Sequence, residues 1–167
     1  MIKGVNSMTE KLPECAILVP VDFSPNSEAA MDYAIKLADA LKSPLVVLHV
    51  VHDPGDEPGF YARKLKKKQI RKIEDIGRDL LSGFIDDMSK RHPDSKAVKH
   101  AILKLLVGLP VTKILQLVEK IQPRTVVMGS RGRSGLSHVF VGSVAERVVH
   151  LCPAPVTIIK VSEEPKK

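Results

Sequence analysis

The chain has 167 residues, which suits a single domain large enough to bury most of its apolar side chains. Hydrophobic residues make up 44% of the sequence but aromatic residues only 4%, so we expect a core of valine, isoleucine and leucine. The net charge is +7, and no run of 18 apolar residues occurs, which argues against a membrane-spanning helix.

The first strong pattern is a short apolar run, Cys15 to Val21, which is typical of a strand buried on both faces. It ends at Asp22-Phe23-Ser24-Pro25, where Ser24 can cap a helix and Pro25 suits the first turn. Apolar residues then follow at helical spacing: Ala30, Ala34, Leu37, Ala38 and Leu41. This segment therefore predicts a strand, a turn and a helix.

The same unit repeats along the chain. Further strands are predicted at Leu45 to Val51, within Val98 to Val107, at Thr125 to Met128 and at Val156 to Val161. A long helix from Tyr61 to Arg91 should bury Ile70, Ile73, Gly77, Leu80, Leu81, Phe84 and Met88. A helix after Pro110 should point Val111, Ile114, Leu115, Val118 and Ile121 inward, and another should run from Ser143 to Leu151. Alternating strands and helices predict a parallel sheet with helices on both faces.

We divide the chain into a flexible N-terminal segment (1–14), one domain (15–161) and a C-terminal tail (162–167). The start of the chain shows no basic, apolar and small-residue leader, so we expect a cytoplasmic protein. Cys15 and Cys152 have neither C-x-x-C nor zinc-site spacing and are interpreted as small core residues. The histidines show no H-E-x-x-H pattern, and we predict no metal ligands in the protein.

The stretch from Val126 to Val144 is the best candidate for a binding site. Its glycines and Ser143 are spaced G-x2-G-x9-G-S, after a β-branched strand and before a helix. Glycines let backbone N–H groups approach phosphate oxygens, and a helix N-terminus adds unsatisfied donors and a positive dipole end. The spacing fits neither a P-loop nor G-x-G-x-x-G, and Ser134 is not in a nucleophile elbow. The alternative is a long turn that uses glycine for positive φ.

On these residues the chain resembles the ATP-binding subgroup of the universal stress protein family, whose ATP motif has the same spacing. The matching text is Met128-Gly129-Ser130-Arg131-Gly132 and Gly142-Ser143-Val144-Ala145-Glu146, and the resemblance runs from about Cys15 to Val161. It implies an α/β fold: a single Rossmann-like open parallel five-stranded sheet of order 3-2-1-4-5 with helices on both faces. Asp22 and Gly129 would then face the crevice at the topological switch point.

The resemblance also implies roles for single residues. Asp22, at the end of Pro20-Val21-Asp22, would accept hydrogen bonds from the nucleoside. Val50 would offer backbone groups to adenine, and Met128 would pack near the ribose. The expected phosphate-side residues are Gly129, Ser130, Arg131, Gly132, Arg133, Gly142, Ser143 and Val144. ATP is the expected ligand, any Mg²⁺ would bind through its phosphates, and no catalytic residue is predicted.

Three functions stay open at this point. The favoured one is an ATP-binding stress-response or signalling module, a switch that presents a surface to an unidentified protein partner. The second is a slow ATP hydrolase that uses the same site. His138 is then the only candidate near the γ-phosphate, on a loop we expect to be mobile. The third is a binder of nucleic acids or acidic surfaces through the basic run.

The basic run explains the net charge. Between Arg63 and Lys72 lie seven cations and no acid, and without them the basic and acidic residues are equal in number, 19 each. No aromatic residues are interleaved with the cations, which weakens single-strand binding, so we predict no specific nucleic-acid binding and interpret the run as a solvated helix face. Because no long apolar run occurs, we expect no membrane partner either.

We also expect a homodimer through the last strand, Val156 to Val161. Only Thr157 and Lys160 are polar there, and a bare apolar edge strand invites aggregation unless it is paired. The resemblance implies the same pairing, about a two-fold axis.

Overall fold

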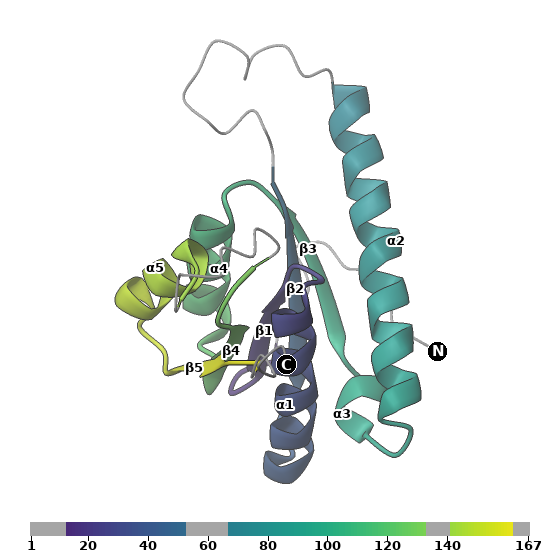
Figure 1. Ribbon diagram of the computed structural model, residues 1–167, viewed down its shortest axis with the longest axis vertical. Helices are drawn as coiled ribbons and strands as arrows, with labels where there is room; N and C mark the ends of the chain where they lie inside the picture. The colour runs from purple at the N-terminus through teal and green to yellow at the C-terminus, as the bar shows by residue number, and fades with distance from the viewer. Residues whose placement is uncertain (1–12, 53–66, 133–140, 162–167) are drawn as a thin grey trace, which may run out of the picture.

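The computed structural model describes residues 13–52, 67–132 and 141–161, with only the backbone of residues 67–71. Within them, the strands are β1 (Ile17–Val21), β2 (Leu45–Val51), β3 (Ile102–Val107), β4 (Thr125–Gly129) and β5 (Val156–Ile159). They form one parallel sheet in the order β3-β2-β1-β4-β5, which confirms the expected fold (Figure 1).

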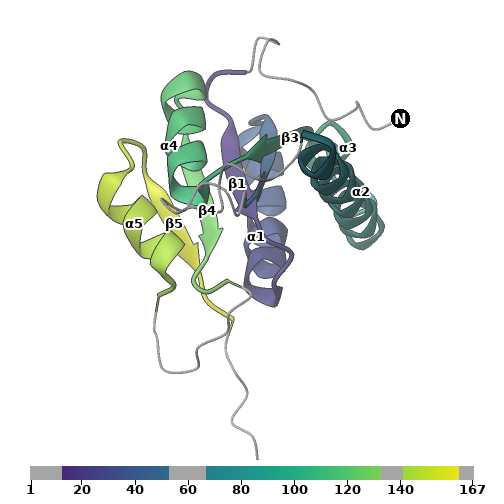
Figure 2. The same cartoon turned by 90° about the horizontal axis from the view of Figure 1, so that it is seen from above.

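Helices cover both faces of this sheet, as Figure 2 shows from above. On one face lie α1 (Pro25–Leu41), α2 (Lys67–Arg91) and the short α3 (Lys96–Lys99), and on the other lie α4 (Pro110–Ile121) and α5 (Ser143–Leu151). The alternation of side chains along a strand divides the core accordingly. In β1, Ile17 and Val19 pack with α1 and α2, whereas Leu18 packs with α4 and α5.

The first helix begins as its sequence predicts. Ser24 is the N-cap, with an extended backbone and a side-chain oxygen that accepts a hydrogen bond from the N–H of Ser27 at 3.2 Å. Pro25 occupies the first helical turn. The helix ends at Leu41, and its C-cap Lys42 has a left-handed backbone (φ 51°) of the kind that glycine usually supplies.

The structure corrects several predicted details. Cys15 precedes β1 and is exposed, not a core residue. The prediction that Leu80 is buried is wrong, since 49% of this residue is exposed. Ile85 is fully buried instead, because the buried face of α2 continues through residues 81, 84, 85 and 88. Leu115 is only half-buried, and Leu117 fills the core in its place. Helix α3 was not predicted at all.

Two further predictions concern where an element begins or ends. The long helix was expected to begin at Tyr61, but residues 61–66 lie outside the described residues, together with the first part of the basic run. Residues 67–72, the rest of that run, belong to α2. The last strand is shorter than predicted, because β5 ends at Ile159. Among the described helices, none combines the length and the apolar character needed to cross a membrane.

Candidate functional site

A cavity of about 220 Å³ opens where the carboxyl ends of β1 and β4 lie side by side. This is the topological switch point of the sheet, because the chain leaves these two neighbouring strands in opposite directions. Every predicted site residue except Arg133, which lies outside the described residues, lines the cavity. The structure adds five more lining residues: Ser27, Leu48, Pro110, Ile114 and Ala145.

None of the three described glycines of the motif is needed for φ, and two of them, Gly129 and Gly132, are needed for space. Gly129, Gly132 and Gly142 all lie outside the left-handed region, so the interpretation as a turn built on positive φ is wrong for them. A Cβ on Gly129 would lie 2.6 Å from the backbone of Asn26, and one on Gly132 would lie 2.8 Å from Asp22 Oδ2. A Cβ on Gly142 would meet its nearest atoms at 3.5–3.6 Å, an ordinary contact.

Backbone hydrogen bonds fix the two ends of the motif against each other. The N–H of Gly142 donates to the carbonyl of Ser130 at 2.7 Å, and the N–H of Ser130 donates to the carbonyl of Ile159 at 2.8 Å. The hydroxyl of Ser130 donates to Asn26 Oδ1 at 3.4 Å, and Ser130 is buried. Ser130 therefore ties β4 to β5 and α1 as well as lining the cavity.

The N-terminus of α5 presents uncapped backbone donors, which favour an anion, at the cavity. Gly142 is its N-cap, with an extended backbone and no side chain to accept from the first turn. The backbone N–H groups that a capping side chain would satisfy are therefore available to a ligand. Ser143, Val144 and Ala145 of this turn all line the cavity. We call residues 129–132 and 142–144 the phosphate cradle.

Asp22 faces the cradle from the end of β1. Its Oδ1 accepts hydrogen bonds from the N–H of Ser24 at 3.1 Å and from the hydroxyl of Ser24 at 2.6 Å. Its Oδ2 is directed at Gly132. The next residue, Phe23, has a φ of 62°, which a bulky side chain rarely adopts.

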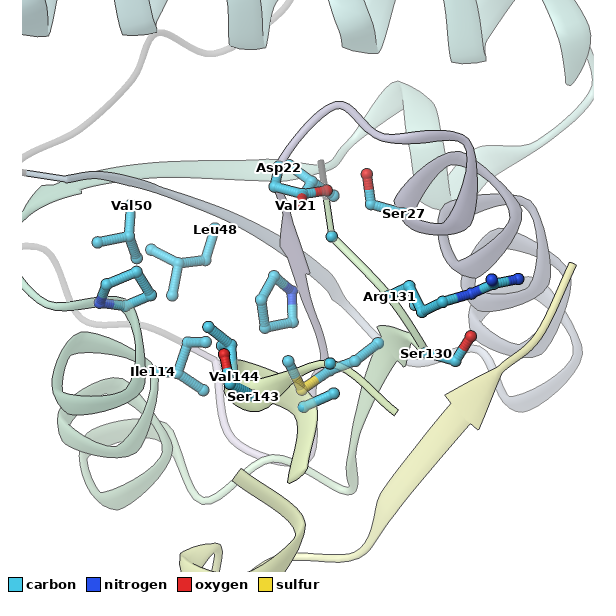
Figure 3. Close-up of a pocket in the computed structure, with 17 residues that line it drawn as sticks. Val21, Asp22, Ser27, Leu48, Val50, Ile114, Ser130, Arg131, Ser143 and Val144 are labelled. Atoms are coloured by element: carbon cyan, nitrogen blue, oxygen red, sulfur yellow. The ribbon is translucent and has the colours of Figure 1, made fainter. Parts of the chain in front are cut away.

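The cavity has one apolar and one polar end. Figure 3 shows Leu48, Val50 and Ile114 gathered at one side, with Ser130 and Arg131 at the other. The side chain of Arg131 extends away from the apolar group (Figure 3). A ligand that fits this lining carries an apolar ring at one end and an anion at the other.

The added lining residues carried signals in the sequence. Leu48 lies two residues before Val50 on β2, and alternation puts both on the same face. Pro110 begins the helix that leaves β3 at the same edge of the sheet. Ile114 is one turn further along α4, so its inward direction, predicted as core packing, also takes it into the cavity.

Asp22 is the one carboxylate among the described lining residues, which include no histidine or glutamate. The described part of the chain holds no cluster of three or more histidine, cysteine or acidic side chains that could bind a metal. His49 does not line the cavity, and its Nδ1 is 2.8 Å from the carbonyl of Val21.

Comparison with known sequences finds one family. The pattern that defines the universal stress protein family matches residues 16–160. A universal stress protein from Methanocaldococcus jannaschii is 30% identical over 152 residues, which cover 90% of this chain and 83% of that protein. One from Mycolicibacterium smegmatis is 31% identical over 144 residues, or 86% of this chain and 45% of that protein. The chain thus spans about half the length of several relatives that it matches.

Solved structures of the same family share the fold. A universal stress protein from Lactobacillus plantarum has a TM-score of 0.66 at 22% identity, covering 89% of this chain and 99% of that one. A universal stress protein in complex with cAMP scores 0.59 at 22% identity, covering 90% and 100%. One from Archaeoglobus fulgidus in complex with dAMP scores 0.60 at 23% identity, covering 89% and 100%. At these identities the likeness concerns the fold.

Proposed function

The chain belongs to the universal stress protein family, and from this premise we propose that its cavity binds an adenine nucleotide, with ATP as the physiological ligand. The observation that carries the proposal is the lining itself. An apolar wall, a carboxylate and an uncapped helix N-terminus line one cavity, and these are groups that suit the base, the ribose and the phosphate of a nucleotide.

We assign the parts of the nucleotide to the lining by their chemistry. The base lies against Leu48, Val50 and Ile114, where apolar contact replaces water. Asp22 accepts hydrogen bonds from the ribose, because a carboxylate only accepts and the ribose hydroxyls can donate. The phosphates lie over the phosphate cradle, where glycine leaves backbone N–H groups uncovered.

Two structural neighbours support adenine as the base. One was solved with cAMP and the other with dAMP, both adenine nucleotides. A chain of phosphates beyond the first is favoured by the charge of Arg131 and by the N-terminus of α5. Mg²⁺ would be held through these phosphates, since the described lining offers it only one carboxylate.

We propose that the protein acts in the cytoplasm as a nucleotide-dependent switch in a stress response. The cradle approaches the ligand through backbone on two separate segments, which the Gly142–Ser130 hydrogen bond already joins, and a phosphate bound to both would restrain them further. The changed surface would then be read by a protein partner. Slow ATP hydrolysis at the same site is the alternative, and the rate of hydrolysis separates the two.

The test is calorimetry with ATP on protein purified gently, with mass spectrometry of any nucleotide that it retains. Gly142→Val should abolish ATP binding, since a branched side chain enters the space that phosphate needs. Gly142→Ala is the matched control: its added Cβ makes only ordinary contacts, so the fold should stay stable and part of the affinity should remain. Gly132→Val should also abolish binding, but it displaces Asp22 as well. Equal ATP affinity in wild type, Gly132→Val and Gly142→Val would refute the assignment.

A further inference from the structure

We propose that His49 is a positioning residue of the nucleotide site: from the opposite face of the sheet it holds the loop 21–24, so that Asp22 faces the cavity. The inference rests on the proposed function, which assigns Asp22 to the nucleoside. It concerns a residue that contacts the ligand nowhere and acts only through its neighbour.

The first contact is a hydrogen bond across two neighbouring strands. His49 on β2 is in register with Val21 on β1, and its Nδ1 lies 2.8 Å from the carbonyl oxygen of Val21. A carbonyl oxygen only accepts, so Nδ1 carries the proton and donates it. The last peptide group of β1 is thereby held in one orientation, directly before Asp22.

The second contact holds the residue after Asp22. Phe23 has a φ of 62°, and its ring centroid lies 4.4 Å from that of His49 and 5.6 Å from that of Phe84 on α2. These ring contacts place Phe23 on the face of the sheet that α1 and α2 cover. These ring contacts offset the cost of a backbone conformation that phenylalanine otherwise avoids.

Asp22 is thus held from both sides. Val21 is bound by His49, and Phe23 is packed between His49 and Phe84, so the side chain between them turns to the cavity. There Ser24 binds Oδ1 and Gly132 lies against Oδ2. If His49 loses its hydrogen bond, the carboxylate loses its fixed direction, and a ligand must then order it on binding.

The experiment is a double-mutant cycle on ATP affinity, measured by calorimetry. His49→Leu removes the donor, and His49→Asn keeps an N–H close to the position of Nδ1. We expect His49→Leu to weaken ATP binding about fivefold, the value of one hydrogen bond, and His49→Asn to recover most of the loss. In an Asp22→Asn background, His49→Leu should change the affinity less than about twofold, because the two residues act as one unit.

A control separates positioning from general destabilisation. Val47 lies on the same strand and the same face as His49 and is fully buried. Val47→Ala should therefore lower stability without changing ATP affinity. If His49→Leu weakens binding equally in both backgrounds, or if Val47→Ala weakens it as much, the positioning role is refuted while the proposed function stands.

A second readout needs no nucleotide. In ligand-free protein, the amide resonance of Ser24 should shift in His49→Leu, since its N–H binds Asp22 Oδ1, and should stay in place in Val47→Ala. An unshifted Ser24 amide in His49→Leu would overturn the inference. This measurement tests the positioning role without ATP, so it also applies if Asp22→Asn binds ATP too weakly for the double-mutant cycle. A wild-type protein that fails to bind ATP would refute the proposed function alone.

Discussion

The end of β4 touches the first turn of α1 backbone to backbone: a Cβ on Gly129 would lie 2.6 Å from the carbonyl carbon of Asn26. Because both partners are main chain, neither can swing aside. We predict that Gly129→Ala destabilises the protein by about 3 kcal/mol or more, which lowers the Tm by about 6–12 °C. Thermal unfolding checks this, with Gly142→Ala as a control that stays within about 2 °C. A Gly129→Ala variant as stable as wild type would contradict the packing.

Hydrolysis of ATP should be absent or slower than about 1 s⁻¹, the lower end of ordinary turnover numbers. Phosphoryl transfer needs a residue that places water in line with the γ-phosphate. Asp22, the one acid in the described lining, already accepts two hydrogen bonds from Ser24 and is assigned to the ribose. A steady-state phosphate-release assay measures the rate. Turnover in the ordinary range that His138→Ala or Asp22→Asn abolishes without loss of ATP affinity would make the protein an ATPase; His138 lies outside the described residues.

At position 23 a glycine should give a more stable protein than an alanine, which is the reverse of the usual order. Both Phe23→Ala and Phe23→Gly remove the ring contacts with His49 and Phe84. Only glycine relieves the left-handed backbone at φ 62°, which costs other residues about 1 kcal/mol. We therefore expect Phe23→Gly to be more stable than Phe23→Ala by about 1 kcal/mol in urea unfolding. The opposite order would show that the backbone is not strained at this residue.

The stability of the protein should depend on Asp39 in acid. Burial raises the pKa of the Asp39 carboxyl, but hydrogen bonds from the Ser95 side chain and from the N–H groups of Ala97 and Lys96 outweigh this, and the pKa falls below its usual 3.8. The folded state therefore binds this proton less readily than the unfolded chain does. The resulting stability is fully present above pH 3.8 and is lost as the pH falls through the folded-state value.

Asp39→Asn tests this linkage. The variant should lower the Tm at pH 7 by about 2–4 °C, as the loss of a capping contact does. The difference from wild type should shrink as the pH falls below about 4, because the wild-type carboxyl is then protonated too. Ser95→Ala removes one of these hydrogen bonds and also the side-chain cap of α3, so part of its stability loss should persist at low pH. A difference that stays constant from pH 7 to pH 2 would exclude the carboxylate as its source.

We predict a homodimer through β5, which pairs with β4 on one side only. The carbonyls of Pro155 and Ile159 accept from β4, so alternation along the strand turns the backbone of Ile158 to the open edge. Ile158→Pro removes an outward N–H and should yield monomers, whereas Ile158→Val should not. Light scattering at micromolar concentration measures the mass. A monomeric wild type would contradict the prediction.

Much of the fold was readable because local patterns report local structure. The apolar run ending at Val21 and the cap at Ser24 each lie within a few turns of chain, and each is found as predicted. The strand order did not come from periodicity, which shows which face of a strand is buried but not which strand lies beside it. The resemblance to the family supplied the order, and the structure confirms it.

Only the tertiary structure decided how the site is held. His49 binds Val21, 28 residues away, and Phe84 reaches Phe23 from helix α2, so no local pattern connects them. The buried face of α2 runs through Ile85 and not Leu80, because the sheet beneath it sets the rotation of the helix. Likewise Leu48 and Ile114 read as core residues until the switch point leaves a cavity between them. Hydrophobicity specifies that a side chain leaves water, whereas packing across the sheet decides what it then touches.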